Sequence, residues 1–297
     1  MNTFAPKAFE PGNKRKRSYF WTIPTAIALF VVGAQWLGLS SMQKSDAVYH
    51  AQKETALVET GHGQGSGVFF KRGNHVFLWT ANHVVENEAS IKIRRILRYQ
   101  NKKAGEMVFP AHLILNYPAA DAAVLLVDAP PSLVEGSVWA SGVEVPGAPV
   151  FTVGNLYGSS FDGSVSTGVI AQLGVDDEDK PSGWPWKLAD QTTVVIAPGS
   201  SGGPVFNQLG EVLGLIVGGP TKGLDSVAIF TPRRVIEAAA NKEPWLFSDG
   251  IPSEAHLQSL MDSETAALLK SLRDQKLEII LQGIEGMPAP KKPSKKK

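Results

Sequence analysis

The sequence contains no cysteine among its 297 residues. This absence excludes disulfide bonds, thiolate zinc sites and a cysteine nucleophile. It does not fix the compartment, because a chain of this length can bury enough apolar surface to be stable without cross-links. Charged residues make up only 19% of the chain, the net charge is +1, and 43% of the residues are hydrophobic. These values are typical of a globular protein rather than a disordered one.

The sequence also lacks histidine and acidic residues at metal-ligand spacing, so we predict neither a metal ion nor a cofactor. His62, His75, His112 and His256 stand without such partners. The acidic run 176–179 could form a calcium loop, but its lack of an interleaved glycine favours a solvated loop. The lysines at the C-terminus have no aromatic residues among them, so we expect a solubilising end and no specific nucleic-acid partner.

A long run without charge lies near the N-terminus, at residues 19–39. A bilayer core of about 30 Å needs roughly 20 helical residues. We therefore predict a transmembrane helix over residues 18–40, contacting membrane lipid through 19–39, after a basic cytoplasmic segment of residues 1–17. The excess of basic residues before the span places the rest of the chain on the non-cytoplasmic side. The alternative is a signal peptide cleaved at a site supplied by Gly38 and Ser40, which would leave a secreted or periplasmic protein.

Short β-rich runs broken by glycine, proline, asparagine and aspartate extend from about Leu57 to Thr231. Many short strands with turn signals between them indicate an all-β sandwich or barrel. After Thr231 the apolar residues take helical spacing. These changes predict a linker over residues 41–57 and a β-rich domain over residues 58–242, whose two halves meet near residues 141–148. They also predict a helical region over residues 243–285 and a disordered lysine-rich tail over residues 286–297.

The sharpest motif is Gly-Ser-Ser-Gly-Gly-Pro at residues 199–204. A serine hydroxyl becomes an effective nucleophile when a base takes its proton, and the reaction needs N–H donors aimed at the developing oxyanion. Glycines beside the serine let the backbone turn tightly and approach a substrate. We expect Ser201 to be the nucleophile, with an oxyanion hole formed by the N–H groups of Gly199 and Ser201. Such a turn would be common if it stood alone.

Two further segments supply a candidate base and a candidate acid. His83 follows the apolar run 76–79, at the end of a predicted buried strand, where it is well placed as a general base. Asp121 precedes the apolar run 122–127 and could hold the tautomer of that histidine. Asp128 follows the same run, about 23 Å from Asp121 along an extended strand, so position alone does not choose between the two acids.

In this order the segments resemble the trypsin-like (chymotrypsin-fold) serine peptidases, and most closely the HtrA/Deg branch. The resemblance is carried by residues 65–68, 80–85, 121–125, 153–155, 164–170, 191–204 and 210–215. It implies two six-stranded antiparallel β-barrels and a serine endopeptidase that forms an acyl-enzyme with His83, Asp121 and Ser201. It favours Asp121 over Asp128, because the family's acid precedes this strand. Members of the branch usually carry a PDZ domain after the protease. Here helices and a lysine tail are predicted after the protease domain instead, so regulation of an oligomer through PDZ domains is not implied. An oligomer remains possible.

The resemblance also implies a pocket for the substrate residue before the scissile bond. Its walls are expected from residues near 226–228 and from Val195, Ile196, Ala197, Pro198, Val217, Gly218 and Gly219. None of these is an acid, so we expect a small or medium apolar side chain rather than lysine or arginine. An extended peptide substrate could add to the free strand edge at Gly218 and Gly219. Position 200 is serine where digestive trypsins have an aspartate that pairs with a new N-terminus, so activation by N-terminal cleavage is not implied.

Two other functions are compatible with parts of the sequence. Residues 199–203 fit the G-x-S-x-G motif of α/β-hydrolases, but that fold needs its acid and histidine after the serine. The later histidine, His256, lies in a helical stretch, and βα alternation is absent. A catalytically silent trypsin-like fold could instead serve as a peptide-binding or chaperone module. The presence of His83, Asp121 and Ser201 argues against that function, and labelling by a fluorophosphonate would discriminate the two.

Overall fold

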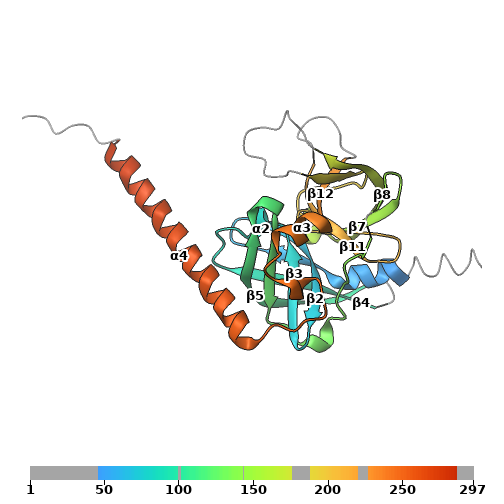
Figure 1. The fold of residues 1–297 in the computed structure, drawn as a ribbon, viewed down its shortest axis with the longest axis horizontal. Coiled ribbons are helices and arrows are strands. Elements are labelled where there is room, and N and C mark those ends of the chain that lie inside the picture. The colour runs from blue at the N-terminus through green and yellow to red at the C-terminus, as the bar shows by residue number, and fades with distance from the viewer. Residues whose placement is uncertain (1–45, 100–101, 143, 176–187, 220–226, 286–297) are drawn as a thin grey trace, which may run out of the picture. The chain divides into compact units, whose positions relative to one another are not determined.

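The computed structural model describes residues 46–99, 102–142, 144–175, 188–219 and 227–285 (Figure 1). The chain divides into two compact units, residues 1–44 and 45–297, and every described residue belongs to the second unit. The predicted basic segment, transmembrane helix and tail, at residues 1–17, 18–40 and 286–297, lie outside the described residues. Among the helices that are described, none combines the length and apolar character needed to cross a bilayer.

The first half of the domain is a closed antiparallel barrel with the strand order β1-β2-β3-β6-β5-β4 (Figure 1). Its strands are β1 (Thr55–Glu59), β2 (Gln64–Arg72), β3 (His75–Thr80), β4 (Ile91–Tyr99), β5 (Lys102–Tyr117) and β6 (Ala122–Val127). Strands β3 and β6 are buried on both faces, because Leu78 points into the barrel core while Phe77 and Trp79 pack outside it. Burial on both faces explains why these strands are continuous apolar runs without polar alternation.

The second half is a closed antiparallel barrel with the order β10-β11-β12-β9-β8-β7. Its strands are β7 (Pro149–Leu156), β8 (Phe161–Val175), β9 (Ala189–Thr192), β10 (Pro204–Phe206), β11 (Val212–Gly218) and β12 (Ala228–Pro232). Val150, Ile170, Val205, Ile216 and Phe230 are buried in its core. The predicted all-β fold of two six-stranded antiparallel barrels is therefore confirmed.

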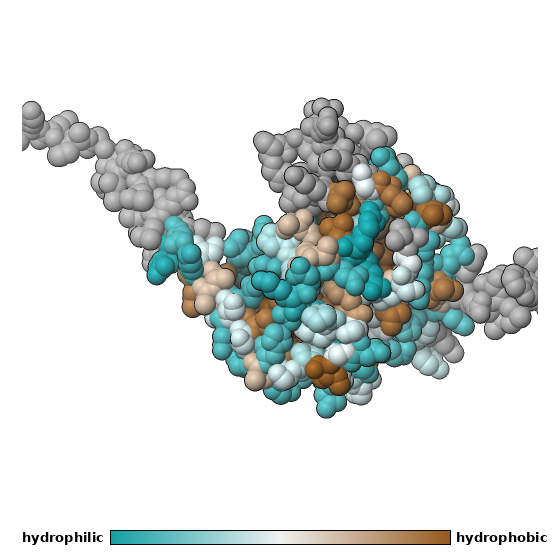
Figure 2. Space-filling model, viewed as in Figure 1, coloured by the Kyte–Doolittle hydropathy of each residue, from teal (hydrophilic) through white to brown (hydrophobic). Residues whose placement is uncertain are grey.

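A continuous apolar cluster joins the two barrels. It contains Phe77 and Trp79 from β3, Phe151 and Phe206 from β7 and β10, and Trp245 from the segment after the second barrel. This cluster packs one barrel against the other. On the face shown in Figure 2, hydrophobic residues form separate small patches among hydrophilic ones.

Short helices occupy the connections and a long one ends the described chain. They are α2 (Asn82–Val85), η2 (Pro118–Ala120), η3 (Pro131–Leu133), η4 (Gly158–Ser160), α3 (Arg233–Ala239), η5 (Pro244–Leu246) and α4 (Glu254–Glu285). Residues 46–54 are also helical, and β1 begins at Thr55, before the predicted domain start at residue 58. The strand begins early because Ala56, Leu57 and Val58 pair with β2 and are buried.

Candidate active site

The barrel register brings His83 and Asp121 together although 38 residues separate them. His83 lies in α2 immediately after β3, and Asp121 lies between η2 and β6. Because β3 and β6 are antiparallel, with Thr80 opposite Ala123, the end of one strand meets the start of the other. His83 Nδ1 lies 2.7 Å from Asp121 Oδ2, and the backbone N–H of His83 donates to Asp121 Oδ1 at 2.9 Å.

The environment of this pair suits an acid that orients a base. The Asp121 side chain is only 4% exposed, whereas that of His83 is 41% exposed. Asp121 has φ 45°, a left-handed conformation that a non-glycine residue adopts at a cost in energy. Burial lowers the pKa of His83, but the hydrogen bond and the negative charge of Asp121, with a contribution from Glu86, raise it above its ordinary value.

The other candidate acid is placed elsewhere. Asp128 follows the far end of β6, and its side chain is 52% exposed. Its carboxylate lies 3.5 Å from His112 Nε2. The structure thus brings Asp121, and not Asp128, to His83.

Ser201 lies in a tight loop that leads into β10. Gly199 and Gly202 on either side of it have φ +95° and +81°, which L side chains rarely adopt. A Cβ at Gly199 would lie 2.3 Å from the Asn155 carbonyl oxygen, and one at Gly202 would lie 2.2 Å from Thr80 Oγ1. Both positions therefore require glycine, which accounts for the motif at residues 199–203.

The Ser201 loop packs against β2, which in turn packs against α2, the helix that contains His83. The Ser201 carbonyl accepts a hydrogen bond of 2.7 Å from the Ser66 N–H in β2. A Cβ on Gly65 would lie 2.7 Å from the side chain of Val84 and 2.9 Å from the Ser201 carbonyl oxygen, so the backbone there has room only for hydrogen. Among the described residues, the Ser201 hydroxyl makes no hydrogen bond to His83. Catalytic hydrogen bonds are often long without substrate and tighten when it binds.

The backbone N–H groups of Gly199 and Ser201 donate to no other group in the described part of the chain. In contrast, the carbonyls of the two residues that precede them accept hydrogen bonds. That of Pro198 accepts from the Tyr157 N–H at 2.7 Å, and that of Ser200 accepts from the Gly203 N–H at 2.9 Å. Since a trans peptide directs its N–H opposite to its carbonyl, these two bonds leave the Gly199 and Ser201 N–H groups pointing away from the protein atoms that hold the loop.

Ser200 stabilises the same loop through two neutral hydrogen bonds. Its N–H donates to the Ala197 carbonyl at 2.9 Å, and its hydroxyl accepts from the Ala197 N–H at 3.0 Å. The residue is 4% exposed. This pair of local bonds occupies the place where the resemblance to digestive trypsins would require an aspartate and a new N-terminus.

The predicted substrate-pocket residues lie on two segments of the second barrel. A Cβ on Gly219 would lie 3.1 Å from Ile196 Cδ1, so these two residues face each other. Val217 is buried against Ala81 next to α2, whereas Val195 is 51% exposed. Ala197 and Pro198 belong to the loop around Gly199. Gly218 pairs with Ile229 after a shift in the register of β11 between Ile216 and Gly218. Residue 226, at the start of the third predicted wall, lies outside the described residues.

Three residues at the site had no predicted role. Ser66 and Asn155 fall within the family-like segments 65–68 and 153–155, yet their side-chain contacts join residues 89 and 133 positions apart. Tyr157 holds the Pro198 carbonyl through its backbone N–H, a contact that no residue-type pattern reveals. Contacts between residues so far apart in the sequence produce no local sequence pattern from which they could be predicted.

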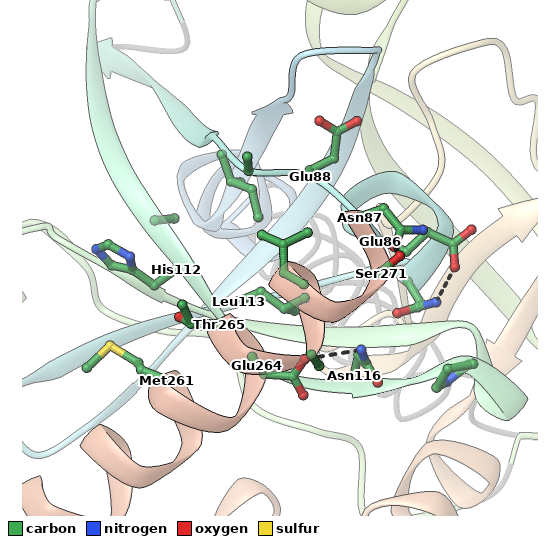
Figure 3. A pocket seen from close by; sticks show the side chains of 17 residues that line it. Glu86, Asn87, Glu88, His112, Leu113, Asn116, Met261, Glu264, Thr265 and Ser271 are labelled. Carbon is green, nitrogen blue, oxygen red and sulfur yellow. Dashed lines mark hydrogen bonds between the residues drawn. The ribbon is translucent and has the colours of Figure 1, made fainter. Parts of the chain in front are cut away.

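A cavity of about 360 Å³ lies between α4, β5 and the segment of α2 and the turn after it (Figure 3). In this cavity Asn116 donates to Glu264 at 3.3 Å, and Ser271 donates to Asn87 at 2.7 Å. Burial raises the pKa of Glu264. His83, Asp121 and Ser201 are not among its lining residues, so this cavity is not the candidate active site.

The family described as "Trypsin-like peptidase domain" matches residues 65–215, about half of the chain. The chain belongs to this family. The predicted resemblance is therefore confirmed, and the relatives support the HtrA/Deg branch. The chloroplastic "Protease Do-like 1" of Arabidopsis thaliana is 29% identical over 54% of this chain and 34% of its own length. A "Probable periplasmic serine endoprotease DegP-like" of Marinomonas sp. is 30% identical over 80% of this chain and 49% of its own.

A crystal structure of the serine endoprotease from Yersinia pestis has the same fold. It superposes with a TM-score of 0.52 at 21% identity, covering 67% of this chain and 65% of that one. The chain spans about half the length, or less, of the curated relatives described above. The comparisons thus show the family and the fold, and the activity is argued below from the site.

Proposed function

We propose that this protein is a serine endopeptidase in which His83, Asp121 and Ser201 form the catalytic triad. The observation that carries the proposal is the double hydrogen bond of Asp121 to the ring and the backbone of His83, beside a serine between two left-handed glycines. Asp121 fixes the tautomer in which Nδ1 carries the proton, so Nε2 is free to act as a base.

The chemistry follows from these positions. His83 Nε2 takes the proton of Ser201 Oγ as that oxygen attacks the scissile carbonyl carbon. The carbonyl oxygen becomes an oxyanion that accepts from the N–H groups of Gly199 and Ser201. When the C–N bond breaks, protonated His83 gives its proton to the leaving amine and an acyl-enzyme remains. Water, deprotonated by His83, then hydrolyses the ester and restores Ser201.

The pocket residues support a preference for a small or medium apolar side chain before the scissile bond. No acid occurs among residues 195–198 and 217–219, and Ile196 opposite Gly219 offers an apolar wall. An apolar wall without a counter-charge would make burial of a lysine or arginine head group costly. Peptide or protein chains are therefore the proposed substrates.

We further propose that the protease acts on the non-cytoplasmic side of a membrane, held there by residues 18–40. Support comes from the uncharged run behind a basic cluster. The Marinomonas relative is named a probable periplasmic protease, which agrees with the same side of the membrane. Release after signal cleavage is the alternative outcome.

The activity is tested by replacing the nucleophile. We expect Ser201→Ala to abolish fluorophosphonate labelling and to lower casein hydrolysis by about 10⁴-fold or more, because the attacking oxygen is lost. Ser248→Ala removes an exposed hydroxyl that donates to the Pro244 carbonyl and accepts from the Gly250 N–H at 3.4 Å. It serves as the matched control and should keep full activity. Labelling of the wild type that persists in Ser201→Ala would refute the assignment. A wild type that binds peptides but is never labelled would identify a silent peptide-binding fold.

A further inference from the structure

Ser66 occupies a fully buried position in β2, and its hydroxyl makes three hydrogen bonds. It donates to the Gly199 carbonyl at 2.7 Å, and it accepts from the Asn155 N–H at 2.9 Å and from Asn155 Nδ2 at 3.2 Å. A hydroxyl has one proton and two lone pairs, so these three bonds use its whole capacity. The two bonds from Asn155 leave the proton free to point at Gly199.

These bonds cross from one barrel to the other. Ser66 belongs to the first barrel, whereas Asn155 and Gly199 belong to the second. The backbone of Ser66 is also held, since its N–H donates to the Ser201 carbonyl and its carbonyl accepts from Thr80 Oγ1. The hydroxyl is therefore a fixed point against which the Gly199 carbonyl is held.

The Gly199 carbonyl lies in the peptide plane between the two planes that carry the oxyanion donors. The Gly199 N–H belongs to the peptide with Pro198, and the Ser201 N–H belongs to the peptide with Ser200. Tyr157 and Gly203 hold those outer planes through their N–H groups. The middle plane sets the angle between the outer two, and its flexible joint is a glycine at φ +95°, the residue with the greatest backbone freedom. The Ser200 N–H of this plane donates to the Ala197 carbonyl within the same loop, whereas the Ser66 hydroxyl ties its Gly199 carbonyl to the first barrel.

We propose that Ser66 is a positioning residue for the oxyanion hole. Its hydroxyl holds the middle peptide plane so that the N–H groups of Gly199 and Ser201 converge on one oxygen. The proposal rests on the proposed serine peptidase function and adds to it a residue that touches neither the substrate nor the His83–Asp121 pair. Because the effect belongs to stabilisation of the transition state, it should appear in kcat rather than in KM.

The test compares the full-length protein with Ser66→Ala and the nearly isosteric Ser66→Cys on a fluorogenic peptide. Direct loss of one oxyanion donor costs about 10²–10³-fold in kcat, so an indirect loss should cost about 10–100-fold in Ser66→Ala, with KM within about twofold. The thiol is a weaker donor, so Ser66→Cys should fall between Ser66→Ala and the wild type. The pH midpoint of kcat/KM should stay at the wild-type value in both variants, since the His83–Asp121 pair is untouched.

Thr55→Val is the matched control, because it removes a buried hydroxyl that donates to the Ala51 carbonyl. It should change thermal stability but not kcat. Folded Ser66→Ala with wild-type kcat would overturn the inference while the activity of the wild type upholds the peptidase function. If Ser66→Ala does not fold, wild-type kcat in Ser66→Cys overturns it equally. A wild type with neither turnover nor fluorophosphonate labelling would instead refute the peptidase function itself.

Discussion

At the scale of single residues, Asp121 has a left-handed backbone conformation that is energetically unfavourable for a non-glycine residue. It adopts φ 45° directly after the 3-10 turn η2, and its side chain is buried where a carboxylate is expensive to desolvate. The two hydrogen bonds from His83 compensate that burial. Strain and burial held together in this way are characteristic of functional sites.

This arrangement predicts different effects for the two acids that flank β6. Asp121→Asn should lower turnover by about 10⁴-fold, because the amide can hold the wrong histidine tautomer. Asp128→Asn should stay within a few-fold of wild type, since its side chain is exposed and contacts His112 instead. Steady-state kinetics on both variants, with a melting curve for each, provide the measurement. The opposite ranking in two folded variants would move the acid to Asp128.

At the scale of elements, a buried ion pair fixes the helix of residues 46–54 to the first barrel. Glu54 is fully buried, and its carboxylate accepts from Gly136 N–H at 2.9 Å and from Arg95 at 3.3 Å. Arg95, in β4, also donates to the Leu133 carbonyl. Burial lowers the pKa of Arg95, which the negative charges of Glu54 and Glu135 partly offset. The pair thus joins the helix, a strand and the inter-barrel connection.

Removing one partner should be costly because it leaves the other charge buried. We expect Glu54→Ala to lower the free energy of unfolding by about 3 kcal/mol or more. Glu106→Ala breaks an exposed ion-pair network with Arg94 and Lys103 and serves as the comparison. It should leave the urea midpoint close to wild type, since exposed pairs contribute little. Equal midpoints for the two variants would show that the buried pair does not fasten this junction.

At the scale of the whole molecule, the candidate site exists because two closed barrels share one apolar interface. His83 and Asp121 come from the first barrel, and Gly199 and Ser201 come from the loop before β10 in the second. The loop docks through the Ser66 N–H and through the Gly202 N–H, which donates to the Ile216 carbonyl at 2.7 Å. Neither barrel alone holds the full set of groups.

The same scale includes the proposed membrane anchor and the proposed non-cytoplasmic position of the protease. A reporter enzyme that functions only outside the cytoplasm, fused after residue 60, should be active, because we expect the basic cluster before residue 18 to be retained inside. N-terminal sequencing of the mature protein supplies the second readout, and a start near Ser41 would show cleavage instead of anchoring. Activity of a cytoplasmic reporter at the same fusion point would reverse the orientation.

The sequence alone predicted an all-β fold and the residue types of the candidate site, because both depend on local chemistry. Continuous apolar runs such as residues 76–79 and 122–127 specify strands buried on two faces. Gly199 and Gly202 were predicted to matter because glycines beside a serine let the backbone turn tightly, and the structure gives both a left-handed conformation. The order of the family-like segments then predicted the two barrels that the structure contains.

Only the tertiary structure decided how these residues meet. Asp121, and not Asp128, lies beside His83, because the antiparallel register of β3 and β6 places the start of β6 next to α2. Ser66 gained a role because closing two barrels brings it within 2.7 Å of a carbonyl 133 residues away. Such contacts depend on the global path of the chain, and no local pattern of residue types encodes them.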